Sequence, residues 1–520
     1  MSCCWTGVSL LIEKRLGGYE HTWQAAEPDA PQNVDPTKFG GKVPHVAVVG
    51  CGLAGLSAAH RLALRGVKVT VFEKDAWLGG KVGSWMETLD SGVEAPIDHG
   101  FHAFFHHYYN LNRWVVELDL RRFQVEIPIY RILTREREVL DFRADVGGAP
   151  GLNLLGLAKE GLFKISDLLK PSVMHMAEFF RYNDPKTFER HDNQSFEDFA
   201  RKVGLPRNLL VVFRTFARTF FAEDDKISQA ELIKSFHFFY LSHPHGLACR
   251  YIRGNYRDQF LNPIRAALEA QGVDFRLSTA VEKIEKVNDS FRVHTAEDAV
   301  EFDAVVLAPN VQAVRKIWDA SPDLARNDSA LSERLGKMKA GQRYAVMRIW
   351  LVGVSPEDEP VFVGTDRFQL LDSMFFLDRI DPDVASCARP LAGDEPIRVI
   401  ELHSYAVPDS MKDRAEVEAA FFDELYHYYP ELKDARVLQR QLQLKDDATA
   451  LHKGMAEARP GTTTADPRLL LAGDWVRLPF PAMLMEAAHT SGAIAANELL
   501  QQWGLARHRV TSVPRKGLLG

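Results

Sequence analysis

The stretch Val46-Ala-Val-Val-Gly-Cys-Gly-Leu-Ala-Gly55 decides the fold. Residues 43–49 form a short valine-rich run, which is typical of a buried parallel strand. A helical pattern follows the glycines and stops at Gly66, and residues 67–72 then predict a second strand. That strand ends at Glu73. The stretch therefore predicts a strand–turn–helix–strand unit of the dinucleotide-binding type.

The glycines in this unit have separate physical roles. Gly50 permits the tight turn, Gly52 lets the backbone approach a pyrophosphate, and Gly55 allows the helix to pack closely on the strand. The helix N-terminus then presents free N–H groups and the positive end of its dipole to the phosphates. Glu73 stands where an acidic side chain accepts hydrogen bonds from ribose hydroxyls.

Two further stretches extend the predicted ligand beyond a simple nicotinamide cofactor. A second glycine loop, residues 78–85, follows the acid at once and suits a ligand as long as flavin adenine dinucleotide (FAD). Near the C-terminal end, residues 469–474 predict an apolar strand that ends in Gly-Asp, where a carboxylate can bind the ribityl or phosphate region. A helix over 483–499 carries small residues that let a ligand or strand approach closely.

Length and composition set the remaining limits. A chain of 520 residues predicts at least two domains, and its net charge of −7 gives no electrostatic case for nucleic acid. Five scattered cysteines without a CxxC pair indicate a reducing compartment. We expect neither a signal peptide nor a transmembrane helix, and therefore a cytoplasmic protein.

The segment Ile97–Tyr109 is dense in histidine and aromatic residues. His102 and His106 have the i,i+4 spacing of a metal pair, but an HExxH motif and an acidic ligand at the right spacing are missing. We therefore predict no metal site and interpret the segment as a polar and aromatic wall beside a flat ring system, or as core packing.

Leucine and phenylalanine are concentrated between residues 150 and 245. Residues 151–169 predict an amphipathic helix, and residues 209–221 place Phe213, Phe216, Phe220 and Phe221 at helical spacing. Three interpretations stay open: a helical core, the lining of a long apolar substrate site, or a face that dips into a membrane surface.

The chain returns to short strands at 273–277, 280–287, 291–294 and 302–307, which predicts that the nucleotide-binding domain is discontinuous. The expected fold is an α/β Rossmann-type FAD-binding domain with an interleaved α+β substrate domain and a helical membrane or substrate subdomain. The expected ranges are an N-terminal extension at 1–42, the FAD-binding domain at 43–145, 246–315 and 456–505, the helical subdomain at 146–245, the substrate domain at 316–455 and a solvated basic tail at 506–520.

These motifs resemble the superfamily of flavin-containing amine oxidases and carotenoid desaturases. The segments 99–109 and 480–497 are most similar to the branch that desaturates β-rings and rearranges them into aromatic rings. The resemblance implies that the cofactor-binding residues are Gly50, Gly52, Leu53, Ala54, Gly55, Glu73, Lys74, Gly79, Gly80, Lys81, Gly100, Phe101, Val281, Gly473, Asp474, Met485 and Ala487.

Within that set, the resemblance places the backbone of Val281 against the adenine, and Met485 and Ala487 near the isoalloxazine ring. The family usually has arginine where Lys81 stands, so a bidentate phosphate contact becomes a point charge.

The implied reaction is desaturation of a long apolar isoprenoid, such as a carotenoid, by hydride transfer from a C–H bond to flavin N5. His102 and Glu486 are the candidate catalytic residues for the proton that must also leave. The apolar polyene is the expected partner together with a membrane surface, and the oligomeric state stays open. Two alternatives remain, an amine oxidase and a flavoprotein that binds a lipid or pigment without turnover.

Overall fold

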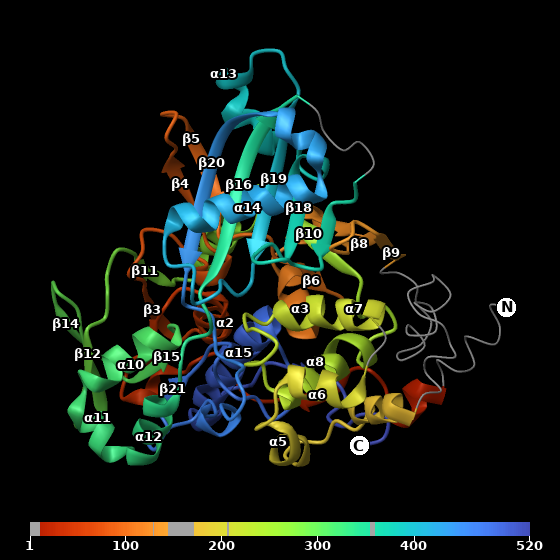
Figure 1. Ribbon diagram of the computed structural model, residues 1–520. Coiled ribbons are helices and arrows are strands. Elements are labelled where there is room, and N and C mark those ends of the chain that lie inside the picture. The colour runs from red at the N-terminus through yellow and green to blue at the C-terminus, as the bar shows by residue number, and fades with distance from the viewer. Residues whose placement is uncertain (1–10, 128, 144–170, 205–206, 354–358) are drawn as a thin grey trace.

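The computed structural model describes residues 11–127, 129–143, 171–204, 207–353 and 359–520 (Figure 1). Its nucleotide-binding part is a five-stranded parallel sheet of order β11-β3-β2-β15-β21. The strands are β2 (His45–Val49), β3 (Lys68–Phe72), β11 (Asp274–Arg276), β15 (Ala304–Leu307) and β21 (Leu469–Leu471). These strands confirm the predicted Rossmann-type unit and its return after residue 246.

Both faces of this sheet are covered. α2 (Leu53–Ala63) and α15 (Leu484–Gln502) pack on one face. The other face meets α10 (Val311–Asp319) and a small antiparallel sheet of β12 (Lys283–Val287), β13 (Ser290–His294) and β14 (Ala299–Phe302). Burial on both sides is the reason that the parallel strands consist of continuous apolar runs.

Close contact between α15 and α2 depends on one glycine. A Cβ atom at Gly492 would lie 2.0 Å from the carbonyl oxygen of Ala54, so any side chain would push the two helices apart. The small residues predicted in this helix therefore serve a helix–helix contact, and α15 is held directly behind the glycine loop that precedes α2.

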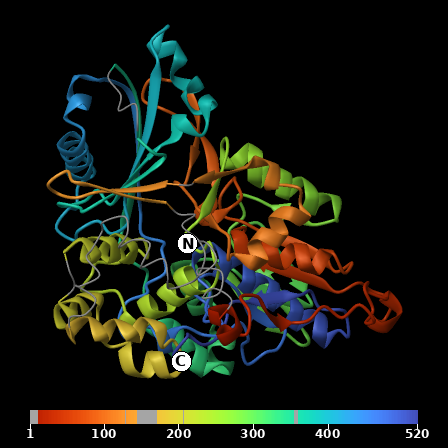
Figure 2. The same cartoon turned by 90° about the vertical axis from the view of Figure 1, so that its right-hand side faces the viewer.

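The substrate domain is a seven-stranded sheet of order β20-β16-β19-β18-β17-β8-β9, with α14 (Arg414–Tyr428) packed against it. In Figure 2 this sheet lies above the yellow helices of the 171–241 region. Its strands are β8 (Ile129–Leu133), β9 (Val139–Arg143), β16 (Tyr344–Val352), β17 (Phe362–Thr365), β18 (Ser373–Phe376), β19 (Ile397–Ser404) and β20 (Arg436–Lys445).

Strands β8 and β9 lie outside the range expected for the substrate domain. We placed residues 43–145 in the FAD-binding domain, but β8 pairs in parallel with β17, with Tyr130 opposite Phe362. The sheet pairing is made with a segment more than two hundred residues away, so nothing local in the sequence marks it.

Smaller elements connect the two domains. A hairpin follows the second glycine loop and consists of β4 (Ser84–Thr88) and β5 (Glu94–Asp98). A three-stranded sheet joins β6 (Phe104–Phe105), β10 (Cys249–Ile252) and β7 (Gln124–Ile127). The other α-helices outside the 171–241 region are α3 (Tyr109–Glu117), α9 (Asn262–Ala270), α11 (Pro322–Asn327), α12 (Ser329–Lys337) and α13 (Arg389–Ala392).

The helical region contains α5 (Lys186–His191), α6 (Phe196–Val203), α7 (Arg207–Arg218) and α8 (Gln229–Phe236). The helix predicted over 151–169 lies outside the described residues. Phe213 and Phe220 are buried, and Phe216, Phe220 and Phe221 line an internal cavity. These positions support the core and the lining interpretations for the phenylalanines, and the membrane face stays a prediction.

The two ends of the chain differ from the expected loose extension and solvated tail. β1 (His21–Gln24) pairs antiparallel with β22 (Val510–Ser512), and Leu16 and Tyr19 are buried. Asn110 in α3 receives a 2.8 Å hydrogen bond from the Thr511 backbone N–H. Each of these strands is too short for its sequence to predict that the two ends of the chain pair with each other.

No helix within the described ranges combines the length and the hydropathy needed to cross a bilayer. Cys51, Cys249 and Cys387, the cysteines in those ranges, are unpaired thiols.

Candidate active site

The two glycine loops near the N-terminal end pack against one another. Gly79 donates a 2.9 Å backbone hydrogen bond to the carbonyl of Cys51, and Gly52 and Gly79 form a parallel bridge. Gly50 has a φ of 98°, and a Cβ there would lie 2.9 Å from the backbone of Ala308. A Cβ at Gly55 would lie only 1.9 Å from the oxygen of Gly50. Gly50 and Gly55 therefore cannot carry a side chain in this double loop.

The carboxylate of Glu73 binds the backbone of the first glycine loop. One carboxylate oxygen accepts a 2.8 Å hydrogen bond from the backbone N–H of Cys51, and the other accepts from the N–H of Asp75 at 3.1 Å. Burial raises the pKa of Glu73, while these two backbone hydrogen bonds act in the opposite direction. The residue is thus fixed beside the glycine loop, where it also faces the cavity.

The Gly-Asp motif after β21 meets the front loops. The Nζ of Lys81 lies 2.6 Å from Oδ2 of Asp474. Gly473 has a φ of 141°, and its N–H donates a 2.8 Å hydrogen bond to the hydroxyl of Ser491 in α15. Two motifs separated by almost four hundred residues therefore form one continuous surface.

A cavity of about 750 Å³ begins at this surface and runs into the substrate domain. Its polar end lies between the glycine loops, α15 and the start of α10. The lining residues at this end include Gly50, Gly52, Leu53, Ala54, Glu73, Lys74, Gly79, Gly80, Lys81, Val281, Asn310, Gly473, Asp474, Met485 and Ala487. Of the expected cofactor-binding residues, all but Gly55 line this one cavity, and Gly55 lies behind the first loop against Gly50.

The donors and the shape of the polar end fit FAD. Gly52 caps α2 without a side-chain acceptor, so the first N–H groups of that helix stay available to an anion such as a pyrophosphate. At Gly52 a Cβ would meet nothing closer than 3.9 Å, so the loop leaves open space on the cavity side. Lys81 and Asp474 supply a cation and a carboxylate further along the same wall.

The other end of the cavity is an apolar arm. Aromatic and aliphatic side chains from β7, β8, α7, β10 and the segment after β5 form its wall. The arm is lined by Phe101, Phe105, Tyr108, Ile127, Tyr130, Ile132, Val212, Phe216, Phe220, Phe239, Tyr240, Leu247, Cys249, Phe362 and Phe375.

Phe101 and Gly100 lie at the junction between the two ends. The ring of Phe101 stacks on Tyr251 at 4.6 Å and on Phe375 at 3.9 Å between ring centroids. Gly100 has a φ of 126°, and a Cβ there would lie 3.0 Å from the ring of His403. These contacts attach the segment after β5 to the substrate domain, where it lines the cavity.

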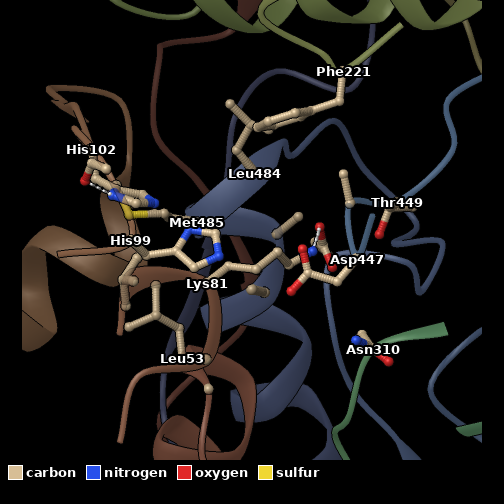
Figure 3. Close-up of a pocket in the computed structure, with 18 of the residues that line it drawn as sticks. Leu53, Lys81, His99, His102, Phe221, Asn310, Asp447, Thr449, Leu484 and Met485 are labelled. Atoms are coloured by element: carbon tan, nitrogen blue, oxygen red, sulfur yellow. Dashed lines mark hydrogen bonds and ion pairs between the residues drawn. The ribbon is translucent and has the colours of Figure 1, made fainter. Parts of the chain in front are cut away.

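Phe221 and Leu484 line the cavity with left-handed backbone conformations. Their φ values are 58° and 50°, which bulky residues adopt only at a cost. In the view of Figure 3 their side chains overlap, although they come from the segment after α7 and from the start of α15. The fold thus maintains two strained residues where the polar end meets the arm.

A hydrogen-bonded cluster of side chains stands beside Phe221, whose ring lies 4.9 Å from the ring of Tyr344. The hydroxyl of Tyr344 donates to Oδ1 of Asp447 at 2.7 Å and accepts from Nε2 of His99 at 3.0 Å. All three residues line the cavity. Figure 3 shows His99, Lys81 and Asp447 facing this side of the cavity.

His102, a candidate catalytic residue, also lines the cavity. Its Nδ1 donates a 2.7 Å hydrogen bond to the carbonyl of Gly100. Burial lowers the pKa of His102 to about 4, so the imidazole is neutral at physiological pH.

Glu486, the second candidate, is not part of the cavity wall. Its carboxylate accepts hydrogen bonds from the backbone N–H groups of Asn110 and Leu111, both at 3.0 Å, and from the Asn110 side chain at 2.8 Å. Because Met485 and Ala487 face the cavity, the residue between them points away and caps α3. The prediction that Glu486 is catalytic is therefore wrong, since helical geometry directs it to the opposite side.

The histidines of the segment 97–109 do not converge. His106 pairs with Glu126 and Arg250 on the outside, and His107 is buried against Phe238 and Phe239. Within the described ranges, no group of three or more histidine, cysteine or acidic side chains is arranged to hold a metal ion.

Tyr344, Asp447 and Leu484 were not predicted from the sequence as site residues. Tyr344 begins a long buried strand, and only its contacts with His99 and Asp447 distinguish its side chain from the others in that strand. No spacing in the sequence links the three, because they lie in segments about one hundred residues or more apart.

Comparisons with known proteins identify the family of this chain. The profile of the family described as flavin containing amine oxidoreductase matches residues 53–342. The carotenoid phi-ring synthase of Streptomyces griseus is 33% identical over 506 residues, which cover 96% of each chain. The zeta-carotene desaturase of Synechocystis sp. is 27% identical over 294 residues, or 52% of this chain and 58% of that protein.

Solved structures show the same fold at low identity. Wild-type putrescine oxidase bound to putrescine superposes with a TM-score of 0.63 at 14% identity, covering 88% of this chain and 99% of that one. An oxidoreductase from Methanosarcina mazei gives 0.62 at 16% identity, with 88% and 100% covered. The chain belongs to the flavin-containing amine oxidoreductase family and is an FAD-dependent oxidoreductase.

Proposed function

We propose that this protein desaturates a ring-bearing carotenoid. The observation that carries the proposal is the single cavity that joins a dinucleotide-binding end to a long aromatic and aliphatic arm. A hydrocarbon substrate offers no polar handle, so apolar contact along its length is the recognition that remains. The similarity to a carotenoid phi-ring synthase over almost the whole chain supports a carotenoid with a β-ring as that hydrocarbon.

When bound, FAD supplies an acceptor for a hydride equivalent at N5 of its ring system. The protein's own residues have other tasks. The glycine loops and the N-terminus of α2 hold the pyrophosphate, Glu73 holds a ribose, and Lys81 with Asp474 lines the ribityl side. Phe221 and Leu484 narrow the junction, where they restrict which part of the substrate passes beside the flavin.

The amine-oxidase alternative is less well supported by the wall of the arm. An amine oxidase would need a pair of facing aromatic side chains before the flavin, and a diamine would also need an acid for its second ammonium group along the arm. Among the described residues that line the cavity, the acids are Glu73, Asp75, Asp447 and Asp474, and none of them belongs to the arm.

Pigment analysis in cells tests the proposed function and also its third alternative, binding without turnover. The gene is expressed in separate bacterial strains that accumulate different carotenes, with and without β-rings, and the pigments are separated by chromatography. We expect a β-ring carotene to be converted into a product with additional double bonds. If all pigments remain unchanged while the protein retains FAD, turnover of carotenoids is ruled out.

We also propose peripheral association with a membrane, since carotenoids dissolve in lipid rather than in water. Ile129 and Val139 are 40% and 53% exposed on the β8–β9 strand pair, and Tyr130 and Ile132 of β8 line the arm. Sedimentation with liposomes of phosphatidylcholine and phosphatidylglycerol tests this surface. The double change Ile129→Asp and Val139→Asp is expected to leave the protein in the supernatant, and unchanged sedimentation would exclude this face.

A further inference from the structure

The hydroxyl of Tyr344 is held at the junction of the cavity by partners from two other segments. Tyr344 begins β16, Asp447 follows the end of β20, and His99 follows β5. The O–H of Tyr344 donates to Asp447 at 2.7 Å, and His99 Nε2 donates to the same oxygen at 3.0 Å. One lone pair of the Tyr344 oxygen is left for a third partner on the cavity side.

The backbone fixes all three residues. The N–H of His99 donates to the carbonyl of Gly83 at 2.9 Å, and the N–H of Gly341 donates to the carbonyl of Ala448 at 2.7 Å. The Tyr344 ring is 4% exposed and lies 4.9 Å from the ring of Phe221. The hydroxyl therefore has a defined position next to the strained residue at the junction, instead of sampling several rotamers.

The charges around Asp447 favour a carboxylate that is ready to accept a proton. Burial opposes its ionisation, but His99, Lys81, the hydrogen bond from Tyr344 and Lys445 outweigh burial and lower the pKa of this carboxyl. Burial lowers the pKa of His99 to about 3, against the opposing charge of Asp447, and burial together with Asp447 raises the pKa of the Tyr344 hydroxyl. The charges of Asp474 and Asp446 raise the pKa of Tyr344 further.

We propose that Tyr344 and Asp447 accept the proton released in desaturation, with His99 as a positioning residue. This inference rests on the proposed function. The proton on the carbon next to the site of hydride loss passes to the Tyr344 oxygen, while the proton of Tyr344 passes to Asp447 Oδ1. The electron pair of that C–H bond becomes the second bond of the new alkene. The electrons of the hydride belong to the flavin.

Asp447 can also return the proton to water. It is half-buried, and its neighbour Asp446 is exposed. Glu486 lies outside the cavity wall. His102 lines the cavity, but its Nδ1 is already engaged with the carbonyl of Gly100. Tyr344 and Asp447 combine a cavity-facing oxygen with a carboxylate acceptor behind it.

Two conservative substitutions test the relay in the FAD-loaded full chain. Tyr344→Phe removes only the hydroxyl, and Asp447→Asn removes only the charge. We expect each to lower the rate of β-carotene conversion by roughly 100-fold or more, the usual range for loss of general acid–base catalysis. The double variant should be hardly slower than either single variant, because both changes break one relay.

Three readouts separate chemistry from structure. Flavin absorbance and the binding of β-carotene, measured by quenching of tryptophan fluorescence, should remain within about twofold of wild type in both variants. The wild-type rate should fall at acid pH, because Asp447 becomes protonated. The rate of Asp447→Asn should not show this decrease. Tyr428→Phe is the matched control, because it deletes a buried hydroxyl that bonds to the carbonyl of Asp366 away from the cavity.

The outcomes distinguish the two proposals. If wild type converts β-carotene and both variants convert it equally fast, the proton relay is overturned while the proposed function stands. If wild type converts no carotene, the proposed function fails and this inference fails with it. If Tyr344→Phe misfolds, Asp447→Asn decides, since its side chain is half-buried and its amide replaces the carboxylate at nearly equal size.

Discussion

The two ends of the cavity are constructed differently. The polar end is made of backbone: glycine loops, a helix N-terminus and a strand terminus approach one another within van der Waals distance. The apolar arm is made of side chains from at least five separate segments. At Gly50 and Gly55 a single added methyl group would therefore collide with backbone, whereas a changed side chain in the arm alters the fit of the substrate only gradually.

The largest effect is expected at the glycines. Gly52 has an extended conformation, with φ −76° and ψ −179°, and space for a side chain within the protein. Gly52→Val should therefore fold but lose FAD, with affinity lowered by about 100-fold or more, because the valine fills the space intended for the pyrophosphate. Flavin content and circular dichroism measure the two properties separately.

Gly55→Val is the matched comparison. Its Cβ would collide with the oxygen of Gly50 at 1.9 Å, so this variant should be insoluble or unfolded. A folded Gly52→Val protein with its full content of FAD would contradict the assigned pyrophosphate site.

The next effect concerns Glu486, on the side of α15 that faces away from the polar end. Burial raises its pKa from 4.5 to about 7. Because the folded protein retains this proton longer than the unfolded chain does, stability should fall as the pH rises from 4.5 to 7, by up to about 3 kcal/mol. The free energy of unfolding, measured with denaturant, should depend less on pH across this range in Glu486→Gln than in the wild type.

The same variant tests the assignment of Glu486 to the cap of α3. Glu486→Gln should convert substrate at nearly the wild-type rate under conditions in which it is folded. A loss of activity without a change in stability would show that Glu486 takes part in the reaction.

A smaller effect is expected in the arm. Phe216 lines it and packs edge-on against Phe220 at 5.2 Å and against Tyr240 at 5.3 Å. Phe216→Ala should lower kcat/KM for a carotene by roughly 30-fold, from about 2 kcal/mol of lost apolar contact, and leave the flavin content unchanged. If flavin is lost instead, the two ends of the cavity are not independent.

The smallest effect is expected at Lys81, where the ion pair with Asp474 is partly exposed to solvent. Lys81→Gln should weaken FAD binding by about fivefold, as the loss of a screened pair predicts. Lys81→Arg should bind at least as tightly as wild type, because arginine keeps the charge and adds donors. Titration of the apoprotein with FAD measures both.

The difference between the ends also explains what sequence can predict. The sequence predicts Gly50, Gly52, Gly55 and Glu73 because a strand, a turn and a helix impose fixed spacings on consecutive residues. Gly473 and Asp474 are readable for the same reason, at the end of an apolar strand. The structure brings all of these except Gly55 around one space, and Gly55 packs behind the loop against Gly50.

The residues of the arm and of the proton relay cannot be predicted from such spacings. Tyr344, His99 and Asp447 meet only because β16, β20 and the segment after β5 are neighbours in three dimensions. The aromatic residues of 209–221 indicated a lining or a membrane face equally well, since amphipathicity does not reveal what covers the apolar side. Glu486 was misassigned because its neighbours in sequence line the cavity while its own side chain points away.

One measurement tests the central claim that a single cavity brings flavin and carotenoid together. The FAD-loaded protein is mixed with β-carotene in detergent micelles without oxygen, and the flavin absorbance and the pigments are followed together. The account predicts that the oxidised flavin band bleaches in proportion to the double bonds formed. A flavin that stays oxidised with carotenes and bleaches with putrescine or another amine would contradict it.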